Sequence, residues 1–267
     1  MNIPTFIRKH HKEAIENLTM EYEADERFQA IIIGGSVAKG FAREDSDIDF
    51  MIVATDEEFK KRLESDDLFI NRTDLTNYTG GFVDGKIIDM KYLKKAVEKG
   101  NEPTRAAFDG AFTVYSKIDY LDELIASITQ YPEESRPEKL RKFYSMSFIQ
   151  NWLMGEATRH NNLYTKSRAA SQLTLFTGRL ILAYNRVLFP YHKWFYEYLN
   201  KCTKKPDGLI DKMNLVLKDP SAKNASALFN CVKNFSDWGV TDIEAFRWFL
   251  EEVELSWVDK QPNLEDW

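Results

Sequence analysis

The amino-acid sequence predicts an α/β (α+β) fold in two parts, a sheet-containing domain over residues 1–132 and an α-helical bundle over residues 133–267. Three observations support this prediction. Short apolar runs that stop at turn residues occur in the first part, a Pro- and Glu-containing segment (YPEESRP) follows at residues 131–137, and helical periodicity fills the remainder.

The first part is expected to alternate helices with short strands. Residues 5–27 carry apolar side chains near helical spacing and predict an amphipathic helix. Two apolar runs, 30–33 and 48–54, predict buried strands, the first ending at Gly34-Gly35. The further predicted elements are a helix over 56–65, a hairpin turning at Asp84-Gly85 with a second arm reaching residue 92, a strand over 111–115 and a helix over 120–129.

The second part is expected to be entirely helical. All six tryptophans lie in it, which is typical of a bundle with large aromatic anchors. The predicted helices span residues 138–163, 167–188, 192–201, 207–217, 221–235 and 241–257.

Charge and composition exclude several classes of protein. The formal net charge of −6 argues against a nucleic-acid partner, which requires a basic surface. No apolar run approaches the roughly 18 residues of a membrane span, and the N-terminal segment is too charged for a signal peptide. Two cysteines, Cys202 and Cys231, are too few for a disulfide framework. We therefore expect a cytoplasmic protein with no membrane partner, and the oligomeric state stays open.

The turn Gly34-Gly35-Ser36 follows the first predicted strand and has the character of a phosphate site. Glycines allow a sharp bend with exposed N–H groups, and a following helix N-terminus adds partial positive charge. An ordinary strand–helix turn is the alternative. A Walker loop is excluded, because Phe41-Ala42 occupy the positions of its Lys-Ser/Thr pair.

Carboxylates follow this turn at strand spacing. Asp47 and Asp49 point to the same face of a strand, where they repel one another unless a cation lies between them. Oxygen ligands of this kind suit Mg²⁺ or Mn²⁺. A solvated edge strand is the alternative, but the flanking run IDFMIVA is too apolar for an edge. Asp89, on the predicted strand after residue 85, would be the third carboxylate if the two strands are neighbours, which is the arrangement for two-metal phosphoryl transfer.

The combination of Gly34-Gly35-Ser36, Asp47-x-Asp49 and a later Asp89 resembles the nucleotidyltransferase signature of the DNA polymerase beta superfamily. The resemblance covers residues 30–91, and the total length with a helical second half is similar to aminoglycoside and lincosamide nucleotidyltransferases. It implies a mixed-sheet nucleotidyltransferase domain over residues 1–132 and a helical acceptor-binding domain over residues 133–267, with the site in a cleft between them.

The activity implied by this resemblance is Mg²⁺-dependent transfer of a nucleoside monophosphate, with pyrophosphate released. AMP from ATP is favoured over another NTP, and the expected acceptor is a hydroxyl of a small molecule such as an aminoglycoside or lincosamide antibiotic. Two alternatives remain: a toxin-type enzyme that modifies protein or tRNA, and a catalytically silent nucleotide-binding regulatory module. An intact and costly carboxylate trio argues against the silent module.

The resemblance also implies roles for individual residues. Gly35 and Ser36 would hold the triphosphate, Asp47 and Asp49 would bind the metal, and Asp89 would complete the metal site, act as the base, or do both.

Three further residues are weighed against simpler explanations. Lys39, near the turn, and Lys193, in the helical part, are candidate partners for the triphosphate, with solvated surface charges as the alternative. Glu156 competes with Asp89 as the catalytic base, against the commoner outcome of a solvated helix glutamate.

Overall fold

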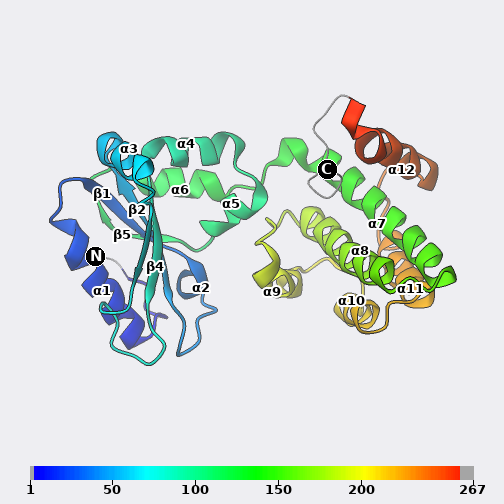
Figure 1. Cartoon of the computed structure of the whole chain (residues 1–267), viewed down its shortest axis with the longest axis horizontal. Helices are drawn as coiled ribbons and strands as arrows, with labels where there is room; N and C mark the ends of the chain where they lie inside the picture. The colour runs from blue at the N-terminus through cyan, green and yellow to red at the C-terminus, as the bar shows by residue number, and fades with distance from the viewer. Residues whose placement is uncertain (1–2, 259–267) are drawn as a thin grey trace. The chain divides into compact units, whose positions relative to one another are not determined.

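The chain divides into two compact units, and the division falls between Gln130 and Tyr131 (Figure 1). A computed structural model describes residues 3–258. Among these residues, no helix combines the length and the apolar character needed to cross a lipid bilayer.

The first unit is built on a five-stranded mixed sheet, which confirms the predicted fold class. The strands follow the spatial order β3-β4-β2-β1-β5. Strands β2 and β4 are parallel, and the other neighbouring pairs are antiparallel. The strand bounds are β1 Phe28–Ile33, β2 Ile48–Ala54, β3 Phe69–Arg72, β4 Val83–Ile88 and β5 Phe112–Ser116.

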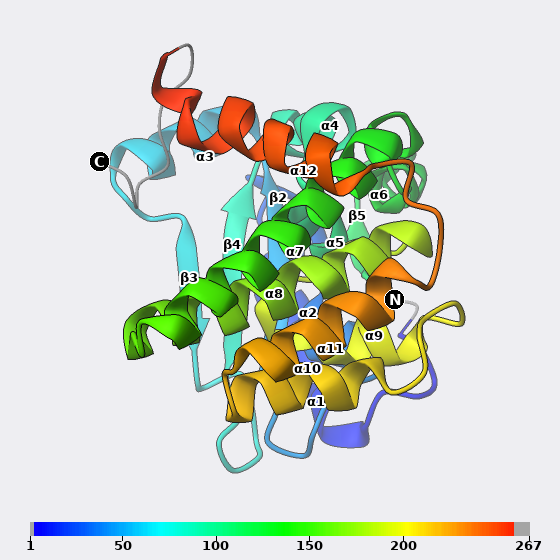
Figure 2. The ribbon, with the colours of Figure 1, turned by 90° about the vertical axis from the view of Figure 1, so that its right-hand side faces the viewer.

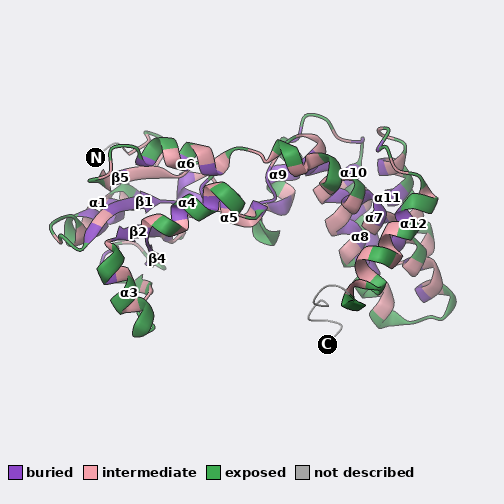
Figure 3. Cartoon of the chain, turned by 90° about the horizontal axis from the view of Figure 1, so that it is seen from above, coloured by how far each residue is buried: buried purple, intermediate pink, exposed green. Residues whose placement is uncertain are grey.

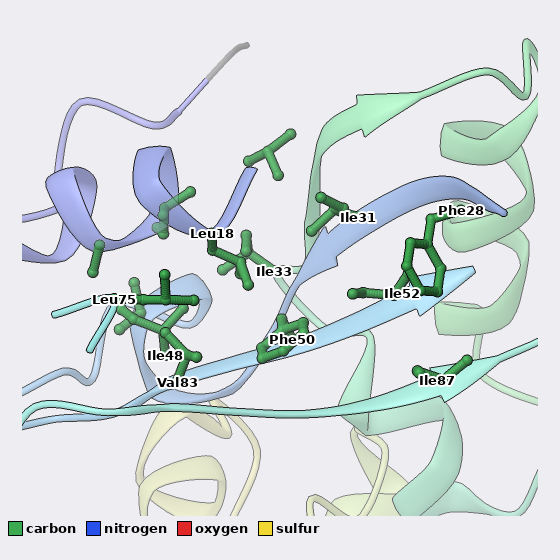
Figure 4. Close-up of a cluster of buried hydrophobic side chains, with 14 of the residues drawn as sticks. Leu18, Phe28, Ile31, Ile33, Ile48, Phe50, Ile52, Leu75, Val83 and Ile87 are labelled. Atoms are coloured by element: carbon green, nitrogen blue, oxygen red, sulfur yellow. The ribbon is translucent and has the colours of Figure 1, made fainter. Parts of the chain in front are cut away.

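Helices cover both faces of this sheet. Their bounds are α1 Lys9–Glu23, α2 Gly35–Ala38, α3 Asp56–Glu64, α4 Met90–Lys99, α5 Glu102–Ala107 and α6 Leu121–Thr129. Side chains of α1 form one core with Ile48, Phe50 and Ile52 of β2 (Figure 4). Side chains of α4 and α6 form a second core with Met51 and Val53. The alternation predicted for this strand is therefore confirmed, and it places Asp49 on the α4 and α6 side.

The predicted hairpin at Asp84-Gly85 is wrong, because β4 runs straight through both residues. A Cβ on Gly85 would lie 2.5 Å from the ring of Phe50, so the glycine makes room for that ring rather than for a turn. The predicted second arm is also shorter than expected, since β4 ends at Ile88 and α4 begins at Met90. Strand β3, which pairs with β4 at the edge of the sheet, was not predicted.

The second unit is helical. Its helices are α7 Arg136–Arg159, α8 Leu163–Tyr184, α9 Phe195–Lys201, α10 Leu209–Lys218, α11 Ala222–Lys233 and α12 Asp242–Phe249. Short turns of 3-10 helix lie at η1 Glu133–Ser135, η2 His192–Trp194 and η4 Ser256–Val258, and a π-helical turn at η3 Leu250–Glu254. Figure 2 shows α7, α8 and α11 side by side, and Figure 3 shows their buried residues in purple. The last helix is shorter than the predicted range of 241–257, because regular α-helix ends at Phe249.

Candidate functional site

Three aspartates meet where β2 and β4 begin. Carboxylate oxygens of Asp47, Asp49 and Asp84 all lie within 4.8 Å of one another. Asp49 and Asp84 are direct partners in the parallel register of β2 and β4, and Asp47 immediately precedes β2. Asp84 is exposed, whereas the other two are half-buried. Three carboxylates at this spacing repel one another unless a cation binds, and a set of hard oxygen ligands suits Mg²⁺ or Mn²⁺.

Gly35 lies directly against this cluster. Its φ is +62°, and a Cβ built on it would lie only 1.7 Å from Oδ2 of Asp49. The preceding residue, Gly34, donates its N–H to the carbonyl oxygen of Asp49 at 2.9 Å. Glycine is required here for two reasons, the left-handed backbone and the space that the carboxylate takes.

Ser36 supplies a buried hydroxyl next to the glycine. The residue is 4% exposed, and its Oγ has no hydrogen-bond partner within residues 3–258. A buried hydroxyl without a partner costs free energy, which a hydrogen bond to a phosphate oxygen would recover. The oxygen donor set, the glycine beside it and this unpaired hydroxyl together fit a nucleotide bound with a divalent cation.

Comparisons with known proteins bear on this site. Residues 22–100 match the family model described as the nucleotidyltransferase domain. This stretch of the chain is a nucleotidyltransferase domain by that match. The matched residues include the glycine turn and all three clustered aspartates, and the domain is that of a nucleotidyl-transfer enzyme.

The solved structures include a similar chain, a nucleotidyltransferase-like protein from Exiguobacterium sibiricum 255-15. It is 11% identical, with a TM-score of 0.48, and the similarity covers 91% of this chain and 80% of that chain. A comparison with curated proteins finds no match.

Asp89 is not a member of the cluster of Asp47, Asp49 and Asp84, which corrects the sequence-based placement. It follows the last residue of β4, and its Oδ1 accepts the backbone N–H of Tyr92 at 2.7 Å, so it caps the N-terminus of α4. Asp89 lies five positions after Asp84 along extended chain, which is about 16 Å at about 3.3 Å per residue. Asp84 is the third carboxylate of the cluster, in the role predicted for Asp89. In the sequence, Asp84 is marked only by its position in the run VDGKII.

A substitution separates the two aspartates. We expect Asp89→Ala to lower the free energy of unfolding by about 1 kcal/mol, because the first turn of α4 loses its cap. The melting-temperature shift caused by Mg²⁺ and ATP should stay as in the parent. Asp89→Asn is the matched control, because its amide oxygen can still cap the helix and stability should change little. Loss of the ligand shift in Asp89→Ala would return this residue to the site.

The other predicted residues have different surroundings. Lys39 donates from Nζ to the carbonyl oxygens of Ala106 at 2.6 Å and Asp109 at 2.8 Å, so its ammonium group ties the end of α2 to the last turn of α5 and the residues after it. Lys193 is an exposed residue of the second unit, with Nζ 5.1 Å from the centroid of the Trp194 ring.

Glu156, the competing candidate base, is also in the second unit. It is half-buried on α7 and pairs with Arg159 at 3.0 Å and, when the imidazole is protonated, with His160 at 3.9 Å. These are surface contacts between neighbouring residues at the C-terminal end of α7, of the kind expected for a structural glutamate.

Proposed function

We propose that this protein is a Mg²⁺-dependent nucleotidyltransferase that moves a nucleoside monophosphate, AMP from ATP, to a hydroxyl of a small molecule. The observation that carries the proposal is the meeting of Asp47, Asp49 and Asp84 beside Gly35. Clustered carboxylates repel one another and would repel the phosphates of a nucleotide, and a divalent cation bound among them relieves this repulsion.

The position of each side chain indicates its proposed role. Asp47 and Asp49 hold the cation, which when bound neutralises phosphate charge and orients the nucleotide. Ser36 donates its hydroxyl to a phosphate oxygen, and the glycine at position 35 lets the nucleotide approach the backbone closely. Asp84, the exposed member of the cluster, accepts the proton of the acceptor hydroxyl. The acceptor oxygen then bonds to the α-phosphorus as the bond to pyrophosphate breaks.

The acceptor that we propose is a small hydroxylated molecule, with aminoglycosides and lincosamides as the first to test. The net charge of −6 disfavours a large polyanion such as tRNA. Modification of a protein or tRNA, and nucleotide binding without transfer, are the competing outcomes of the assay.

The assay uses the full chain with each α-labelled NTP, Mg²⁺ and separate acceptors. We expect ATP to label an aminoglycoside or lincosamide with release of pyrophosphate, and EDTA to stop the reaction. Labelled tRNA, with affinity that falls steeply with salt, would move the acceptor to nucleic acid. Binding of Mg²⁺ and ATP with no labelling of any small molecule, tRNA or lysate component would identify a silent module.

A further inference from the structure

The segment that leads into Asp47 is held by side chains from elsewhere in the first unit. We call residues 42–46 the Asp47 loop. Three alternate carbonyl oxygens of this loop are hydrogen-bonded. Arg8 donates to the oxygen of residue 42 at 2.6 Å, His10 Nε2 lies 3.1 Å from that of residue 44, and the Tyr78 hydroxyl donates to that of Ser46 at 2.7 Å.

The aromatic members of this group pack on one another. The Tyr78 ring lies 4.6 Å from the His10 ring and 5.2 Å from the His11 ring, measured between centroids. His11 is 1% exposed, and burial together with the neighbouring His10 lowers its pKa to about 4. The Tyr78 ring therefore packs in a T-shaped contact on a buried imidazole that is neutral at pH 7.

Tyr78 is fixed from its other side as well. Its carbonyl accepts the N–H of Gly81 at 3.0 Å, and a Cβ on Gly81 would lie 2.6 Å from the Tyr78 ring. Burial and the negative charge of Asp47 raise the pKa of Tyr78 to about 12. An ordinary tyrosine also keeps its proton at pH 7, so the hydroxyl is available to donate to the carbonyl oxygen of Ser46.

Asp47 needs such support more than its neighbours do. Asp49 lies in β2 and Asp84 in β4, where ladder hydrogen bonds fix their backbones, whereas Asp47 lies just before β2. A ligand carried by a mobile segment must be ordered when the metal binds, and this ordering weakens affinity.

We infer that Tyr78 is a positioning residue for the metal site. By holding the carbonyl of Ser46, its hydroxyl fixes the peptide that precedes Asp47 and keeps the Asp47 carboxylate directed at Asp49 and Asp84. The inference rests on the proposed function, in which Asp47 and Asp49 hold the cation. The Tyr78 hydroxyl donates to a backbone carbonyl oxygen and not to a carboxylate of the cluster, so its role is indirect.

The test is Tyr78→Phe in the full chain, which keeps the ring and removes only the hydroxyl. Mn²⁺ is titrated calorimetrically in the presence of α,β-methylene-ATP, which does not transfer its nucleotidyl group. We expect the Mn²⁺ dissociation constant to rise about three- to tenfold, the range for one lost hydrogen bond. Affinity for the analogue in EDTA should stay within about twofold, and saturating Mn²⁺ should restore the parent melting-temperature shift.

Two further variants sharpen the test. Tyr115→Phe removes a hydroxyl from β5, which is separated from β2 by β1, and should match the parent in every measurement. His10→Ala removes the contact with residue 44 and should raise the Mn²⁺ dissociation constant in the same direction.

The outcomes are distinct. A Tyr78→Phe protein with parental Mn²⁺ affinity, even if less stable, would overturn the inference and leave Tyr78 a structural residue. If Tyr78→Phe weakened binding of the ATP analogue equally with Mn²⁺ and in EDTA, the hydroxyl would act on the nucleotide rather than on the metal. That result would overturn the inference too. A parent chain that binds the analogue but no Mn²⁺ would overturn the proposed function, and this inference with it.

Discussion

Asp49→Asn is expected to abolish nucleotidyl transfer without unfolding the protein. Asp49 supplies the carboxylate that both touches the Gly35 turn and faces Asp84, so no neighbour can replace it. Losing a ligand of the divalent cation removes several kcal/mol of transition-state stabilisation, which is about 10³-fold or more in turnover. Stability should be unchanged or slightly higher, because one of three mutually repelling charges is gone.

Thermal melts and label transfer measure the two halves of this result. A ligand at 100 times its dissociation constant stabilises the parent by about 2.7 kcal/mol, and the variant should lose this shift for Mg²⁺ with ATP. Asp45→Asn is the matched control, since Asp45 is an exposed aspartate two residues before Asp47 that pairs with Arg43 at 3.1 Å. It should keep both the shift and the activity. An unchanged shift and rate in Asp49→Asn would refute the metal assignment.

Gly35→Ala is also expected to cause a large loss of turnover, although it adds only a single methyl group. The new Cβ would occupy the position of the Asp49 carboxylate, which must then turn away from Asp47 and Asp84. Turnover should fall about 10²-fold or more, the scale for misplaced groups in an active site. The left-handed backbone adds a stability loss of about 1–2 kcal/mol.

Gly40→Ala separates the collision from the backbone strain. Gly40 also has a positive φ, +73°, but the nearest atom to its added Cβ is 4.0 Å away, on Phe6. We expect this control to lose similar stability and to keep its activity within a few-fold of the parent. If Gly35→Ala behaved like Gly40→Ala in both respects, the turn would have no role beyond folding.

Some features of this protein were determined by the sequence alone, because they depend on local geometry. The period of two along β2 separates Ile48 and Phe50 from Asp49 and Met51, and the structure confirms that separation. The glycine pair before Ser36 predicts a sharp turn without knowledge of its partners. Helical periodicity after residue 137 likewise identifies the helices of the second unit, with errors confined mainly to their ends.

The third carboxylate was decided only by the tertiary structure. Asp84 and Asp89 lie on the same short stretch of chain, and local pattern favoured a turn at the first and a strand at the second. The parallel register of β2 and β4 places Asp84 beside Asp49, and the fit of the Phe50 ring over Gly85 keeps the chain extended there. Asp89 falls beyond the strand and caps α4 instead. Register between strands distant in sequence arises from packing that no local pattern encodes, so the sequence could predict two members of the cluster but not the third.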